Sequence, residues 1–145
     1  MKILPDTSIW VRLFRPGRDP DAEHLLGLAE RGELVACGPV LAELLVGAPA
    51  EEREAIRATV GSLPWVDLDQ AAWWEAGVAG RELRRRGISV PLVDLAIAAA
   101  AVREGAEVWT LDRDFERIRE VLPALELHRP PGASYPPPRR RRALA

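Results

Sequence analysis

The sequence predicts an α/β fold: one domain with a central, mainly parallel sheet of four to five short strands and helices on both faces. Short apolar runs alternate along the chain with segments whose apolar residues recur at helical spacing, and such alternation is typical of parallel sheets. The 145 residues are enough to bury the core of one domain. The segment 91–104 is apolar on nearly every side, as expected for a deeply buried helix.

The chain begins with a short apolar strand. The run at 2–4 ends at Pro5, and polar turn-forming residues follow it. Thr7 or Ser8 is suited to cap a helix that starts near Ile9, because a side-chain hydroxyl can accept a hydrogen bond from a free N–H of the first turn.

The next segments predict three helices and a second strand. We expect helices at 21–31, 39–46 and 51–63, and a strand at 34–37. Gly32 and Gly47 stop the first two helices, and Pro64 breaks the third. Pro39 suits the first turn of its helix, where no N–H is needed.

The second half continues the alternation. We expect an extended segment at 65–68, helices at 70–86, 91–104 and 114–121, and strands at 107–111 and 125–127. Gly87 and Gly105 end the two long helices, and Pro91 opens the second of them.

The composition changes at residue 130. Residues 1–129 form the predicted domain, and residues 130–145 read PPGASYPPPRRRRALA. A proline-rich, arginine-rich segment of this kind has too few apolar side chains to pack, so we expect a disordered tail.

Composition excludes several classes of protein. The chain has 48% hydrophobic and 29% charged residues, which is typical of a soluble globular protein. One cysteine, Cys37, permits no disulfide within the chain, and two distant histidines make a zinc site of Cys/His type unexpected. No apolar run is long enough to span a membrane, and the N-terminus does not resemble a signal peptide, so we expect a cytoplasmic protein.

The charge is uneven along the chain. The formal net charge is −2, but four of the 20 basic residues are the consecutive arginines at 139–142. The rest of the chain is therefore acidic, and any nucleic acid would have to be bound by local arginine patches.

Four acidic residues stand inside apolar runs: Asp6, Glu43, Asp94 and Asp112. A buried carboxylate is costly unless it is paired or binds a cation. The two that follow strands project beyond the carboxyl edge of the sheet, and the helices that carry the other two start at the same edge, so all four can converge there.

Such a cluster requires a divalent cation. Ligation by oxygen alone, without histidine or cysteine, indicates Mg²⁺ or Mn²⁺. A site of this kind leaves positions for water and phosphate oxygens, which is the equipment for metal-assisted hydrolysis of phosphodiester bonds.

The ordered motifs resemble those of a PIN-domain ribonuclease of the VapC type, the toxin of a toxin–antitoxin pair. The matching residues are DTS at Asp6–Ser8, AEL around Glu43, PLVDLAIAA around Asp94 and TLDRDF at Thr110–Phe115. The resemblance covers roughly residues 1–128. It implies a PIN-like nuclease domain that hydrolyses RNA.

The resemblance also implies the roles of the site residues and the partners. Asp6, Glu43, Asp94 and Asp112 would hold Mg²⁺, with Mn²⁺ able to substitute, and would orient the attacking water. Asp114 would contribute to a second metal position, and Ser8 and Thr110 would form hydrogen bonds in the site. The expected partners are an RNA substrate, a VapB-like antitoxin and a second copy of the chain in a homodimer.

Several of these residues have simpler interpretations. Asp6 alone can cap the first helix, and Asp94 can form an ion pair with an arginine. If Asp112 and Asp114 are not both ligands, Asp114 is expected to cap a helix at 115–121. Among the tryptophans, we expect one of the adjacent Trp73 and Trp74 to pack inside, because neighbouring residues cannot share one helical face.

The arginines at the end of the long helix have two interpretations. Arg81, Arg84, Arg85 and Arg86 form a solvated face near a helix C-terminus, which suits positive charge. Alternatively, they contact RNA phosphates beside the acidic pocket.

Two other functions fit part of the pattern. A receiver-type or phosphatase-type Mg²⁺ domain also places aspartates beyond strand ends, but it needs a lysine near the phosphoryl group. Lys2 is the only lysine, and it lies at the wrong end of the first strand. A non-catalytic PIN-like module that binds metal or a partner is the other alternative.

Overall fold

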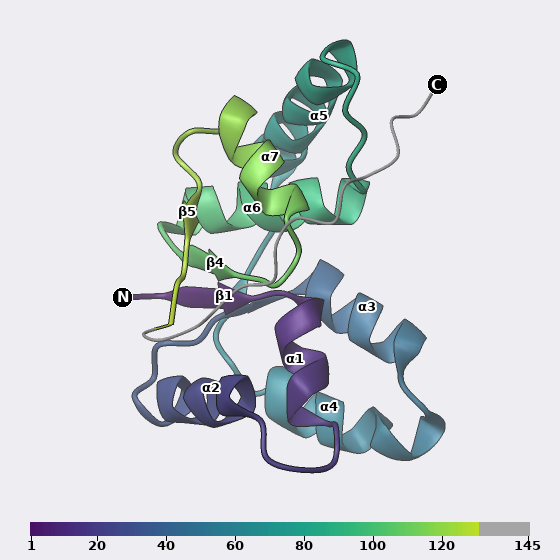
Figure 1. The fold of residues 1–145 in the computed structure, drawn as a ribbon, viewed down its shortest axis with the longest axis vertical. Helices are drawn as coiled ribbons and strands as arrows, with labels where there is room; N and C mark the ends of the chain where they lie inside the picture. The colour runs from purple at the N-terminus through teal and green to yellow at the C-terminus, as the bar shows by residue number, and fades with distance from the viewer. Residues whose placement is uncertain (131–145) are drawn as a thin grey trace.

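The computed structural model describes residues 1–130 and confirms the predicted α/β class (Figure 1). Its strands are β1 (Ile3–Pro5), β2 (Ala36–Cys37), β3 (Trp65–Val66), β4 (Glu107–Trp109) and β5 (Glu126–Leu127). Three of them form a sheet in the order β1-β4-β5, and β2 pairs with β3. All of these pairs are parallel.

Strand β1 joins the two sheets. A parallel bridge links Ile3 to Leu34, and Val35 donates a backbone hydrogen bond of 2.9 Å to the Ile3 carbonyl. The strands therefore follow one another in the order β3-β2-β1-β4-β5, with β1 in the middle.

Helices cover both faces of these strands in Figure 1. On one face lie α1 (Thr7–Leu13), α2 (Pro20–Glu30), α3 (Gly38–Gly47) and α4 (Arg53–Val60), with a short 3₁₀ turn at Ala50–Glu52 before α4. On the other lie α5 (Gln70–Arg85), α6 (Leu92–Glu104) and α7 (Asp114–Val121). The candidate site lies at the edge where β1 and β4 end.

Helix α6 is the central helix of its layer. Every residue from Asp94 to Ala101 is buried, as the apolar sequence predicts. Five of these residues are alanines, which let neighbouring helices approach closely. A Cβ atom added at Gly80 of α5 would lie 2.8 Å from Leu95 Cδ1, so a larger residue here would force the Leu95 side chain to shift.

Some predicted boundaries are wrong for identifiable reasons. The first helix begins at Thr7 because Asp6, not Thr7 or Ser8, is its N-cap. The helix predicted at 51–63 divides into the 3₁₀ turn and α4. The strands at β2, β4 and β5 are shorter than the apolar runs that contain them, since the sheet pairs only part of each run.

The tryptophans separate into core and surface. Trp10 and Trp109 are buried, but Trp73 and Trp74 are both exposed, by 47% and 75%. The prediction that one of the adjacent pair packs inside is therefore wrong. The inner face of α5 carries Ala72 and other small residues against α6, which leaves no space for an indole.

Within residues 1–130, no helix is long and apolar enough to cross a membrane. The predicted tail at 130–145 lies, apart from its first residue, outside the described part of the chain.

Candidate active site and metal centre

Five acidic side chains from separate elements meet beyond the carboxyl ends of β1 and β4. Asp6 directly follows β1, and Asp112 lies in the loop after β4. Glu43 is on α3, Asp94 is in the first turn of α6, and Asp114 is the first residue of α7. The chain folds this way because helices that follow parallel strands start at the same edge of the sheet.

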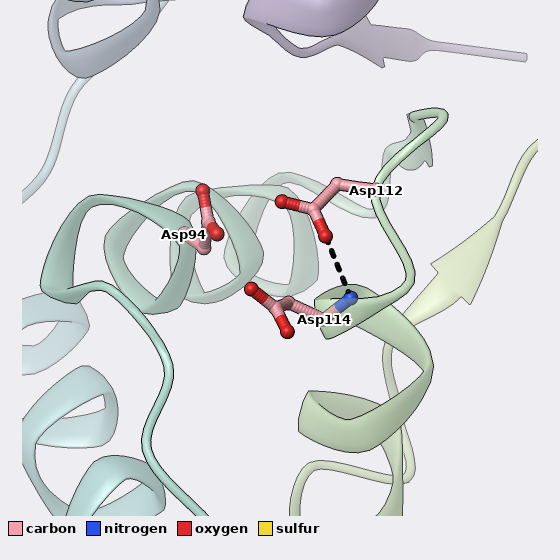
Figure 2. A group of neighbouring side chains, drawn as sticks. All are labelled: Asp94, Asp112 and Asp114. Carbon is pink, nitrogen blue, oxygen red and sulfur yellow. Dashed lines mark hydrogen bonds between the residues drawn. The ribbon is translucent and has the colours of Figure 1, made fainter. Parts of the chain in front are cut away.

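Three of these carboxylates form a compact group. Each of Asp94, Asp112 and Asp114 offers an oxygen, and the three oxygens lie within 4.8 Å of one another. Figure 2 shows the side chains pointing toward a common space, Asp94 from α6 and the other two from the loop and start of α7. Asp112 Oδ1 also accepts a hydrogen bond of 2.9 Å from the Asp114 N–H, which fixes the two relative to each other.

Asp6 is held by two hydroxyl groups. Its Oδ1 accepts from the Ser8 backbone N–H at 3.0 Å and from Ser8 Oγ at 2.5 Å. Its Oδ2 accepts from Thr110 Oγ1 at 2.5 Å. Both carboxylate oxygens are therefore fixed, and the side chain is buried.

The same hydroxyls connect Asp6 to the loop after β4. Ser8 Oγ accepts from the Leu111 N–H at 3.0 Å, and Thr110 Oγ1 accepts from the Asp112 N–H at 2.8 Å. Each hydroxyl thus donates to Asp6 and accepts from the loop. The network sets the position of Asp112 relative to Asp6.

Glu43, like Asp112, is an exposed member of the set. Its Oε1 accepts a hydrogen bond of 2.5 Å from Thr7 Oγ1, which ties α3 to α1. Sequence reasoning did not identify Thr7 as a site residue. The signal was present, because Thr7 stands between Asp6 and Ser8 in the DTS motif.

The crowding of charge shifts two pKa values upward. Burial, followed by the charges of Asp112, Asp6, Asp114 and Glu43, raises the pKa of Asp94 to about 7. Burial raises the pKa of Asp6 to about 6, although the hydrogen bonds from Ser8 and Thr110 oppose the rise. The other four carboxylates are therefore all close enough to Asp94 to repel its charge.

The donor set fits a hard divalent cation. It consists of carboxylate oxygens, and no histidine or cysteine of residues 1–130 belongs to it. Mg²⁺ and Mn²⁺ prefer such ligands. A cation would also relieve the repulsion that raises the pKa of Asp94.

The simpler interpretations are only partly compatible with this geometry. Asp6 does cap α1, but both of its oxygens also belong to the hydroxyl network. Asp94 forms no ion pair with an arginine in the described part of the chain. The expectation that Asp114 caps α7 is wrong, because it is the first helical residue and the carboxylate of Asp112 accepts from its N–H.

Pockets lie on both sides of the acidic group. One, of about 280 Å³, is bounded by α1, α3 and α4 and includes Thr7, Phe14, Glu43 and Ile56. The other, of about 430 Å³, lies between α5 and the start of α6.

Only part of the predicted arginine cluster lines the second pocket. Arg81 and Arg84 line it. Arg85 does not, because its guanidinium pairs with Glu82 of the same helix at 2.9 Å.

Comparison with known proteins agrees with the resemblance. The PIN domain family model matches residues 3–121. Ribonuclease VapC11 of Mycobacterium tuberculosis is 34% identical over 125 residues, which are 82% of this chain and 92% of the relative. Ribonuclease VapC18 of the same organism is 29% identical over 126 residues, 83% and 90% of the two chains.

Solved structures give the same result. VapBC2 from Rickettsia felis, bound to a DNA fragment from its promoter, matches with a TM-score of 0.71 and 27% identity, covering 88% of this chain and 98% of that one. DNA-bound VapBC from Salmonella typhimurium matches with a TM-score of 0.71 and 25% identity, covering 88% and 97%. Fold, motif order and sequence identity agree, and the chain belongs to the PIN-domain family, in its VapC branch.

Proposed function

We propose that this protein is a metal-dependent endoribonuclease that hydrolyses RNA phosphodiester bonds and acts as the toxin of a VapBC-type toxin–antitoxin pair. The observation that carries the proposal is the convergence of Asp94, Asp112 and Asp114, with oxygens within 4.8 Å of one another. The curated relatives named VapC ribonuclease support the same activity.

The chain's own residues divide the work of the site. Asp94, Asp112 and Asp114 would hold Mg²⁺ or Mn²⁺, with Asp6 and Glu43 contributing from the facing elements. When bound, the metal polarises a phosphoryl oxygen and lowers the pKa of a water molecule. Ser8 and Thr110 hold Asp6 in position, so their contribution is orientation rather than direct contact with the RNA.

Two protein partners are supported, one by the neighbouring structures and one by an exposed apolar surface of this chain. Both neighbouring structures described above are VapBC complexes, which supports a VapB-like antitoxin as the partner of this chain. The exposed apolar residues Trp73, Trp74 and Val78 lie on the outer side of α5. A surface of this kind suits a second copy of the chain in a homodimer.

The direct test is cleavage of a mixed, structured RNA pool by the full-length protein with Mg²⁺, with Mn²⁺ and with EDTA. Asp94→Asn is the inactivating variant, and Asp67→Asn, at an exposed position outside the site, is its matched control. We expect cleavage that needs metal, is lost in Asp94→Asn and is unchanged in Asp67→Asn. Full activity of folded Asp94→Asn would overturn the assignment.

The structure argues against a receiver-type or phosphatase-type activity. Lys2 forms an ion pair with Glu104, at the C-terminal end of α6. Asp94 lies in the first turn of the same helix, ten residues before Glu104, and ten residues rise about 15 Å along a helix axis. The only lysine is therefore remote from the acidic group.

A non-catalytic PIN-like module is the remaining alternative. It would keep the acidic group to bind a metal or a partner without cutting RNA. Expression of the protein without its antitoxin separates the two functions: a ribonuclease arrests growth, and Asp94→Asn relieves the arrest.

A further inference from the structure

We propose that the pocket between α5 and the start of α6 binds the phosphates of the RNA strand and leads that strand to the acidic group. We call this pocket the arginine groove. The inference rests on the proposed ribonuclease function and adds to it the path of the substrate. It assigns the contacts to Arg81 and Arg84 and excludes Arg85.

The arginine groove is large enough for part of an RNA backbone. Its volume is about 430 Å³, within the range of roughly 300–1,000 Å³ that is usual for ligand sites. The residues that line it come from the C-terminal half of α5, from the connection before α6 and from the first turn of α6. They are Ala76, Gly77, Gly80, Arg81, Arg84, Ile88, Ser89, Val90, Leu92 and Leu95. Two glycines of α5 lack side chains that would otherwise narrow it.

Two of the four nearby arginines are available to a ligand. The side chains of Arg81 and Arg84 are exposed and form no ion pair within residues 1–130. They are three residues apart and so share one helical face. In contrast, Arg85 and Arg86 both pair with Glu82, at 2.9 and 3.2 Å.

The arginine groove adjoins the acidic group through α6. Leu92 and Leu95 line the groove, and Asp94 lies between them in sequence. At about 100° per residue, Asp94 lies about 100° from Leu95 and about 160° from Leu92 around the helix axis, so the groove and the carboxylate face different sides of the first turn of α6. A strand that occupies the groove would therefore reach the acidic group around the N-terminal end of α6.

The pocket on the other side of the acidic group does not suit a polyanion. Its charged lining residues are Glu43 and Glu52 against one arginine, Arg15, and its interior includes Phe14 and Ile56. The arginine groove has two cations and no carboxylate in its lining. Of these two pockets, the arginine groove is therefore the one whose lining favours phosphates.

The test measures RNA binding by the full-length protein carrying Asp94→Asn, so that the RNA is not cut. The probe is a fluorescein-labelled, mixed-sequence single-stranded RNA in Mg²⁺, followed by anisotropy from about 50 to 200 mM salt. The test variant is Arg81→Gln with Arg84→Gln. The matched control is Arg85→Gln with Arg86→Gln, which removes the same charge from the same helix end.

We expect the test variant to bind RNA about tenfold more weakly at low salt. Its plot of log affinity against log salt should be shallower by about 1.4, since each phosphate contact to a single strand contributes about 0.7. The control should keep most of its affinity and its slope. Thermal unfolding of both variants verifies that each is folded.

Other results would overturn the inference. Equal weakening in the two double variants would show that only overall charge matters. Unchanged RNA binding by the test variant would show that the groove is not on the RNA path. If the same variant lost antitoxin binding while it kept RNA binding, the groove would be a protein-docking surface. If the protein without any substitution cleaves RNA, these results reject only the groove; if it neither binds nor cleaves RNA, the proposed function fails too.

Discussion

Replacing Asp94 with asparagine should stabilise the metal-free protein above neutral pH. The raised pKa, from 3.8 to about 7, means that the folded state holds a proton on Asp94 that the unfolded state releases. This contribution to stability is present below about pH 4 and is lost as the pH rises through 7. The shift corresponds to about 4 kcal/mol at about 1.4 kcal/mol per pKa unit.

The neutral asparagine avoids this loss, because it imitates the protonated acid at every pH. We expect Asp94→Asn to be more stable than the unsubstituted protein by about 1–4 kcal/mol at pH 8 in EDTA, the lower figure allowing for an imperfectly bonded amide. The difference should shrink toward pH 4. With Mg²⁺, the unsubstituted protein should regain stability at pH 8, because the cation replaces the proton.

The assay is urea unfolding between pH 4 and 8.5, followed by tryptophan fluorescence, in EDTA and in Mg²⁺. Asp67→Asn is again the control, because this exposed carboxylate lies outside the acidic group. An Asp94→Asn protein that is less stable at pH 8 in EDTA would refute the reasoning. So would a metal-free protein whose stability rises from pH 5 to pH 8.

Three further predictions concern the support of the site, a histidine pair and the surface. Thr110→Val removes the donor to Asp6 and the acceptor of the Asp112 N–H, so activity should fall about 10–100-fold. The hydrogen bond from Thr110 lowers the pKa of Asp6, so its loss should move the acid limb of the pH–rate profile to higher pH. His24 Nε2 lies 3.0 Å from His128 Nε2, and burial, then the charges of His128 and Arg31, lower the pKa of His24 below 6.5. The stability advantage of the unsubstituted protein over His24→Gln should therefore diminish in urea titrations as the pH falls below 6.5, and an advantage constant from pH 7.5 to 5 would contradict this. Trp74→Ser should shift the protein from dimer to monomer in light scattering, whereas a monomeric unsubstituted protein at micromolar concentration would disprove the proposed interface.

The sequence predicted best what depends on local pattern. Helix 91–104 has apolar residues on every side and agrees with α6, and the isolated charge of Asp94 within it led to the acidic group. The order of strands and helices likewise predicted the sheet edge at which Asp6 and Asp112 meet. Both inferences need only periodicity and the rule for parallel sheets.

What the sequence did not predict depends on distances between elements. Trp73 and Trp74 are both exposed because the buried face of α5 is formed by Ala72, Ala76, Ala79 and Leu83 instead. Likewise, the arginines at the end of α5 look alike in sequence. The position of Glu82 separates Arg85, which is paired, from Arg84, which has no ion pair among residues 1–130.

The hydroxyl network explains how the acidic group can persist before a metal binds. Burial makes ionisation of Asp6 unfavourable, but its carboxylate accepts hydrogen bonds from two hydroxyls and a backbone N–H, which partly stabilise the ionised form. Asp94 shows no such donor within residues 1–130, so repulsion and burial raise its pKa further, to about 7 against about 6 for Asp6. The two buried carboxylates therefore differ: the hydroxyl network positions Asp6, whereas Asp94 would be fully ionised near neutral pH only with a cation bound. Metal binding should accordingly release protons near neutral pH, and Asp94, rather than Asp6, should be their main source.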